Sequence, residues 1–123
     1  MRIFKTKAFS RFAKKAKLDD NSLYKAVMEA EQGLIAGDLG GGVIKQRVAK
    51  PSSGKLTGFR TIIAYRKGKN AFFIHGYTKT EKDSIENDER AALRCLAAVL
   101  LNYDDDELAH VMKNQTLIEV NIR

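Results

Sequence analysis

The chain has 123 residues, 44% of them hydrophobic and 30% charged, with a formal net charge of +7. This length and composition are typical of one globular domain spanning residues 1–123, and they exclude both a disordered segment and a bilayer-spanning helix. One cysteine and two histidines exclude an internal disulfide, and we expect no metal site and no other cofactor.

The first third of the chain predicts a strand and two helices. Residues 2–5 are a short strand candidate, and apolar residues then recur at helical spacing from Phe9 to Ala16. A cluster of helix-capping residue types at 19–22 predicts the start of a second helix. This helix should bury Leu23, Val27, Ala30 and Leu34, and the glycine-rich segment 37–42 should be a loop.

Three strand-like segments follow, and they read GGGVIKQRVAK, GFRTIIAYRKG and AFFIHGYTKTEK. A long connection over 51–58 joins the first two, and the short turn at 67–70 suits a hairpin between the second and third.

Two helices should follow these strands, because Asp83 and Glu86 resemble a capping box, as do Asp104 and Glu107. The first of these helices should bury Ile85, Ala92, Leu93, Leu96, Val99 and Leu100. Segment 116–120 has strand character without an evident partner. The order of elements predicts an α+β two-layer fold with a mostly antiparallel sheet, a core over 1–85 and a helical extension over 86–123.

Positive charge recurs on alternate residues of the three strands. Successive side chains of a strand point to opposite faces of the sheet. One face should therefore be apolar and carry Ile44, Val48, Phe59, Ile63, Phe72 and Ile74. The other should carry Lys45, Arg47, Arg60, His75, Tyr77 and Lys79, which suit the binding of phosphates and the transfer of protons.

Charge is also divided along the chain. Residues 1–82 contain 18 Lys and Arg against 6 Asp and Glu, a net of +12, whereas residues 83–123 have a net of −5. Two surfaces with different partners are expected from this division. The basic part suits a polyanion such as nucleic acid, although solubility alone would also explain it.

The phrases GGGVIKQRVA, GFRTIIAYRKG and AFFIHGYTKTEKDSI, together with the order of elements, resemble the RelE/HigB-type toxins of bacterial type II toxin–antitoxin systems, in the RelE/ParE superfamily. The likeness covers residues 1–85, and the acidic extension is longer than in the smallest members. It implies a RelE-like, microbial-RNase-like fold and an endoribonuclease that cleaves mRNA without metal, commonly on the ribosome. It also implies a cognate antitoxin as partner, and we expect a cytoplasmic protein with no membrane contact.

The resemblance also implies roles for individual residues. By position, Arg60 matches the arginine near the start of the central strand, and Lys79 and Lys82 match the basic residues that close the last strand. Lys45 and Arg47 lie where basic residues would face RNA.

Two further candidates depart from the family pattern. The tyrosine that some members use lies nearer the C-terminus than Tyr77, and His75 has no uniform counterpart.

Metal-free RNA cleavage needs a base for the 2′-OH, cations for the phosphorane and an acid for the 5′-oxygen. Arg60 suits the cationic role because guanidinium binds phosphate in a bidentate manner. His75 suits proton transfer because its unperturbed pKa is near neutrality. Tyr77 could orient the 2′-OH or stack on a base. A lysine acid, Lys79 or Lys82, would need a pKa lowered by neighbouring positive charge.

Each of these residues also has an ordinary structural interpretation. Arg60 would cap the end of the sheet, His75 and Tyr77 would pack as strand residues, and the lysines would be solvated. Two other functions fit the same pattern, namely a ParE-like inhibitor that binds DNA gyrase without catalysis, and a nucleic-acid-binding module without activity.

Overall fold

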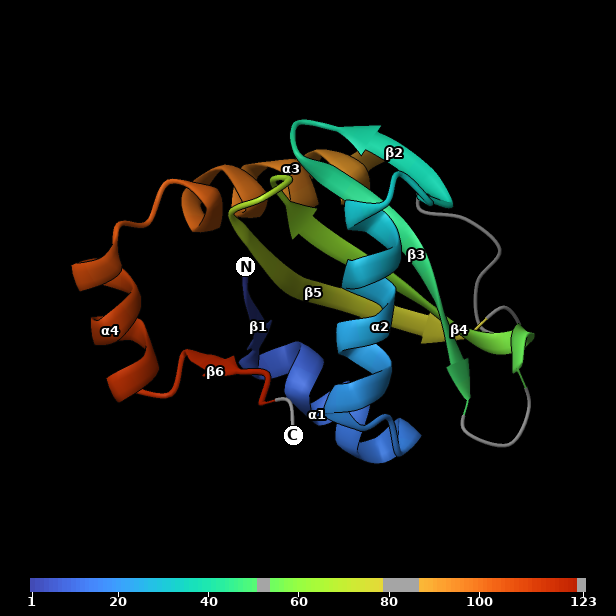
Figure 1. Cartoon of the computed structure of the whole chain (residues 1–123). Coiled ribbons are helices and arrows are strands. Elements are labelled where there is room, and N and C mark those ends of the chain that lie inside the picture. The colour runs from blue at the N-terminus through green and yellow to red at the C-terminus, as the bar shows by residue number, and fades with distance from the viewer. Residues whose placement is uncertain (51–53, 79–86, 122–123) are drawn as a thin grey trace.

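The structure, a computed structural model, describes residues 1–50, 54–78 and 87–121. It is an α+β fold in which helices pack on an open sheet (Figure 1). The elements in chain order are β1 (Arg2–Thr6), α1 (Lys7–Ala16), α2 (Asp20–Glu31), β2 (Gly37–Gly40), β3 (Val43–Lys50), β4 (Gly54–Tyr65), β5 (Asn70–Thr78), α3 (Asn87–Leu101), α4 (Asp105–Lys113) and β6 (Leu117–Glu119).

The six strands form one sheet in the order β2-β3-β4-β5-β1-β6. Neighbours pair antiparallel except β1 and β5, which are parallel. The mostly antiparallel sheet confirms the predicted fold class. The C-terminal strand candidate does have a partner, because β6 pairs with β1.

Two capped helices, α1 and α2, cover one face of the sheet. Thr6 Oγ1 accepts a hydrogen bond from the Phe9 N–H at 3.1 Å, and Asp19 Oδ1 accepts one from the Ser22 N–H at 2.9 Å. Such caps satisfy backbone donors that the first helical turn leaves unpaired. The predicted start of the second helix is therefore confirmed, and α1 includes the predicted helical residues 9–16.

Apolar side chains from both helices and four strands form the core on this side, which we call the closed face. Phe9 and Phe73 pack with ring centroids 5.1 Å apart, and Leu23, Val27 and Ile63 belong to the same cluster. A backbone without a side chain is required at Gly76, where a Cβ would lie 2.3 Å from a ring carbon of Phe12. The glycine lets α1 sit directly on β5.

Helix α3 packs on the opposite face, which we call the basic face. Ala97 and Leu100 are buried there against strand residues that include Ile62 and Phe72. In Figure 1, α2 lies in front of the sheet and α3 passes behind β2 and β3. Helix α4 contributes Leu108 to the same cluster, after a start at Asp104 whose predicted capping box is present.

The prediction for the buried side of α3 is half wrong. Leu93 and Leu100 do face the sheet, but Leu96 and Val99 are exposed, and Ala92 is exposed as well. The helix is apolar on most of its circumference, so spacing alone did not identify the side that packs. Ile85 lies outside the described residues.

Two predictions before β3 are also wrong. Leu34 is 60% exposed, because α2 ends at Glu31 and Leu34 follows the helix. The segment expected to be a loop contains β2, whose glycines are held in the sheet by antiparallel pairing with β3. Further along, β4 begins at Gly54, within the predicted connection.

Candidate functional site

The strand register places five of the predicted site residues in two adjacent rows. Arg47 of β3, Arg60 of β4 and Tyr77 of β5 are direct cross-strand neighbours. In the next row Lys45, Ile62 and His75 are neighbours in the same way. Paired residues share a face of a sheet. The alternation along β3 and β4 therefore groups these cations as predicted, on the basic face.

The predicted alternation is wrong for β5. The β4–β5 register shifts between Ile62 and Ile63, which pair with His75 and Phe73, so Ile74 is an extra residue. Such a bulge interrupts the two-residue period of the strand. Phe72 and Ile74 consequently lie in the same apolar cluster as Tyr77, and not on the face opposite to it.

We call these five residues the patch, and the solvent exposure of their side chains decreases from β3 to β5. Arg47 is exposed, Lys45, Arg60 and His75 are half-buried, and Tyr77 is only 3% exposed. A ligand can approach from the β3 side, where the cations are, and would meet the apolar cluster at Tyr77. The patch thus combines accessible positive charge with a low-dielectric boundary, where charge interactions are stronger than in water.

Lys45 extends towards the edge of the sheet. A Cβ at Gly37 would lie 3.2 Å from Lys45 Cε, so the lysine side chain lies along the bare backbone of β2. Glycine at residue 37 leaves room for the lysine side chain, which a larger residue would push aside. Lys45 therefore extends away from Arg60 and enlarges the cationic surface towards β2.

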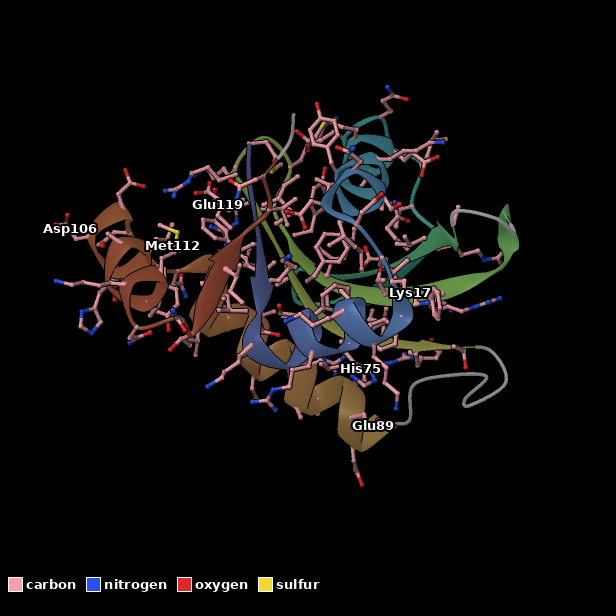
Figure 2. All side chains as sticks on the ribbon, turned by 90° about the horizontal axis from the view of Figure 1, so that it is seen from below. Lys17, His75, Glu89, Asp106, Met112 and Glu119 are labelled. Atoms are coloured by element: carbon pink, nitrogen blue, oxygen red, sulfur yellow. The ribbon has the colours of Figure 1, made fainter. Side chains whose placement is uncertain are left out.

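His75 and Tyr77 are neighbours along β5, with ring centroids 5.8 Å apart and planes tilted by 33°. Figure 2 shows His75 in the space between the sheet and the beginning of α3, where Glu89 is labelled. An imidazole at this place is half-buried and lies on the same face of the sheet as Arg60 of the adjacent strand. An imidazole so placed can exchange a proton with a phosphate that the arginine binds.

Arg60 has an unusual hydrogen-bonding state. Its Nη1 atom is buried and has no hydrogen-bond partner within the described ranges. A guanidinium carries only donors, so it can be satisfied only by an acceptor. A buried donor of this kind is what an anionic ligand rich in acceptor oxygens would pair with.

Helix α3 contributes a cation that the sequence analysis overlooked. Arg90 precedes Leu93 by three residues and Ala97 by seven, so it lies on the stripe of α3 that faces the sheet. Its Nε atom is buried and also lacks a partner among the residues described. The helical spacing to Leu93 and Ala97 was the signal that could have identified it.

The hairpin that joins β4 to β5 is anchored on the closed face. The Tyr65 hydroxyl donates to Glu31 Oε2, and the Gly68 N–H donates to the same oxygen at 3.1 Å. The bond from Tyr65 holds the pKa of Glu31 below its usual value. Burial and the bond to Glu31 raise the pKa of Tyr65. The two strands that carry Arg60 and His75 are therefore fixed to the end of α2.

The last two predicted site residues, Lys79 and Lys82, lie outside the described residues, as does the predicted capping box at Asp83. Across the parts of the chain that are described, no group of three or more His, Cys, Asp or Glu could hold a metal ion. In those same parts no helix is both long and apolar enough to cross a membrane.

Comparison with known proteins gives one result. The family model described as the RelE toxin of the RelE / RelB toxin-antitoxin system matches residues 1–120. The match includes the basic face and also the C-terminal extension. No curated protein matches the chain.

Proposed function

The chain belongs to the RelE toxin family of toxin–antitoxin systems, and on this premise we propose that it is an endoribonuclease that cleaves mRNA without a metal ion. A toxin of this family has an antitoxin as partner. The observation that carries the proposal is the row of Arg47, Arg60 and Tyr77 with His75 beside it, on one face of the sheet. It combines phosphate-binding cations with a group able to transfer protons.

The proposed reaction is an in-line attack of a ribose 2′-oxygen on the adjacent phosphorus. The bond from the 2′-oxygen to phosphorus forms while the bond from phosphorus to the 5′-oxygen breaks. The 2′ proton goes to a base, and the 5′-oxygen receives a proton from an acid. The products are a 2′,3′-cyclic phosphate and a 5′-hydroxyl end, so no oxidant, reductant or additional reactant is needed.

Arg60 is the proposed transition-state stabiliser. Its Nη1 atom is buried and has no acceptor among the described residues, so it can donate to a phosphoryl oxygen. A preorganised donor aimed at developing charge contributes roughly 10²–10³-fold to the rate. Because Arg60 is half-buried, its interaction with a phosphorane is screened less than that of a surface arginine.

His75 is the proposed proton-transfer group. It is half-buried, and its ring lies against Tyr77 at a centroid distance of 5.8 Å. General acid–base catalysis by such a group contributes roughly 10²–10⁴-fold. Tyr77, being buried, would act by orienting the imidazole. Lys79 and Lys82 are proposed to contribute the opposite proton transfer or a phosphate contact.

Lys45 and Arg47 are proposed to bind the RNA backbone beside the cleaved bond. Arg47 is exposed in the same row as Arg60, and Lys45 reaches over Gly37 at the edge of the sheet. A strand of RNA lying across β3 would contact both residues. We further propose that the substrate is mRNA bound to ribosomes in the cytoplasm, because the large positive charge of residues 1–82 suits a surface rich in RNA.

The test is expression of the toxin without its antitoxin, followed by a transcriptome-wide map of RNA 5′ ends. The parent should stop growth and produce new 5′-hydroxyl ends, and Arg60→Ala should produce few. Arg66→Ala is the matched control, because Arg66 is an exposed arginine just after the same strand. Intact mRNA during growth arrest would contradict the proposal, and DNA damage signalling in that case would favour gyrase inhibition.

A further inference from the structure

Arg90 enters the space between α3 and the basic face. The buried side of α3 is formed by Leu93, Ala97 and Leu100, which pack against the sheet. Arg90 continues this stripe by one helical turn towards the beginning of α3. Its side chain therefore points to the face of the sheet that carries Arg60 and His75, and not to solvent alone.

A second arginine on the same stripe provides a comparison. Arg94 follows Arg90 by four residues, and its Nη1 donates to the Leu39 carbonyl oxygen at 2.8 Å. Its side chain also packs against Gly41, where a Cβ would lie 2.9 Å from Arg94 Cδ. Arg94 thus connects α3 to the β2–β3 turn, which explains it as a structural residue. Nothing of this kind is found for Arg90 in the described ranges.

Arg60 and Arg90 share an unsatisfied state. Arg60 Nη1 and Arg90 Nε are both buried, and neither has an acceptor within residues 1–50, 54–78 and 87–121. The two residues cannot satisfy each other, because a guanidinium has donors and no acceptor and stays charged at any physiological pH. Each of these buried donors can be satisfied by an acceptor oxygen, such as one of an RNA phosphate.

We propose that Arg90 is a second phosphate-binding arginine of the site, which contacts an RNA phosphate from the α3 side while Arg60 contacts it from the sheet. This inference rests on the proposed function and assigns it a further substrate-binding residue. A phosphodiester offers two unesterified oxygens, so each guanidinium can donate to one of them. Binding would satisfy both buried donors with charge-assisted hydrogen bonds.

The test uses two probes that do not depend on cleavage. The first is a 2′-O-methyl oligoribonucleotide, which has no free 2′-OH, titrated at several salt concentrations. The second is inorganic phosphate, measured by the rise in unfolding temperature. For Arg90→Gln we expect weaker oligoribonucleotide binding by about tenfold and a salt slope smaller by about 0.7, as one lost contact with single-stranded RNA predicts. The rise in unfolding temperature with phosphate should also be reduced.

Three further variants make the result specific. Arg11→Gln, at an exposed position of α1, removes the same charge from another surface and should leave both measurements unchanged. Arg94→Gln should lower the unfolding temperature without changing the salt slope. Arg90→Lys should keep most of the salt slope but lose affinity, because an ammonium cannot make the bidentate contact.

Each outcome decides the inference. An Arg90→Gln salt slope and phosphate response equal to those of the parent would overturn it, and so would a parent that binds neither probe. If Arg90→Gln lowers stability to the same extent with and without phosphate, Arg90 is only structural. If both probes depend on Arg90 but the parent cleaves no mRNA, this inference stands and the proposed nuclease function fails.

Discussion

The buried polar groups on the two faces of the sheet differ in whether they have hydrogen-bond partners. On the closed face, Gln46 is 3% exposed and donates to the Ala26 and Leu34 carbonyls at 3.0 and 2.9 Å, while its Oε1 accepts from the Ala36 N–H at 2.9 Å. On the basic face, Arg60 and Arg90 have buried donors without acceptors among the described residues. Native proteins rarely leave such groups unpaired. The difference separates a face optimised for stability from one suited to a ligand.

The largest expected effect comes from Arg60→Met, which should reduce RNA cleavage by roughly 10²–10³-fold. The same change should leave the free energy of unfolding unchanged or raise it, because an apolar side chain of similar size replaces a half-buried guanidinium whose buried Nη1 has no acceptor among the described residues. Cleavage assays and urea unfolding of the same preparations measure both quantities. A loss of stability comparable to that expected for Gln46→Ala on the closed face would instead show that Arg60 has a structural role.

On the closed face, Gln46→Ala should have the opposite profile. It leaves the buried Ala26 carbonyl without its partner, and also the partly buried Leu34 carbonyl and Ala36 N–H, and a buried unsatisfied group costs about 1–3 kcal/mol. We expect a loss of about 2–4 kcal/mol in the free energy of unfolding. Cleavage per folded molecule should not change. The exposed Gln32→Ala is the matched control, and an equal loss there would contradict this explanation.

Gly76→Ala tests how closely α1 approaches β5. Its new methyl group would lie 2.3 Å from the Phe12 ring, so either the ring or the backbone of β5 must shift. Overpacking of this kind costs about 1–3 kcal/mol. Urea unfolding measures the loss, and a smaller side chain in the double variant Phe12→Leu with Gly76→Ala should recover part of it. No recovery would show that the cost arises elsewhere.

The smallest expected effect is that of Tyr65→Phe, which removes a hydrogen bond to a carboxylate and should cost about 1–2 kcal/mol at neutral pH. Because the pKa of Glu31 is lowered in the folded protein, its contribution is present above the unfolded pKa of about 4.3 and is lost as pH falls through the folded value. Parent and variant should therefore converge in acid.

Alkaline pH has the corresponding effect on the parent. The folded pKa of Tyr65 is raised, so its contribution is complete below the unfolded pKa of about 10 and is lost as pH rises through the folded value. Urea unfolding from acid to alkaline pH measures both limits. A difference between Tyr65→Phe and the parent that stays constant over this range would contradict the hydrogen bond as its cause.

Much of the fold could be predicted because its signals are local. Asp19 and Asp104 are capping residues whose side chains accept from backbone N–H groups three residues away, so sequence spacing contains the information. The alternation in β3 and β4 identified the face of Lys45, Arg47 and Arg60 for the same reason. These parts of the candidate site needed no knowledge of distant contacts.

The remainder depends on contacts between distant segments. The bulge next to Ile62 places His75 in the same row as Ile62 and Lys45, and a one-residue shift of this kind has no clear sequence signal. The buried side of α3 is another example, because Leu96 and Val99 are as apolar as Leu93 and Leu100. Only packing on the sheet decides which stripe is covered.

By itself, the sequence determined the α+β class, the capped starts of α2 and α4 and the alternating cations of two strands, since each is encoded within a few consecutive residues. The tertiary structure alone decided that the Nε atom of Arg90 is buried and that Tyr77 is buried. It also decided that Gln46 is satisfied while the buried Nη1 of Arg60 has no acceptor among the described residues. The physical reason is that burial and hydrogen-bond satisfaction depend on which segments meet, and this is set by the free energy of packing the whole chain.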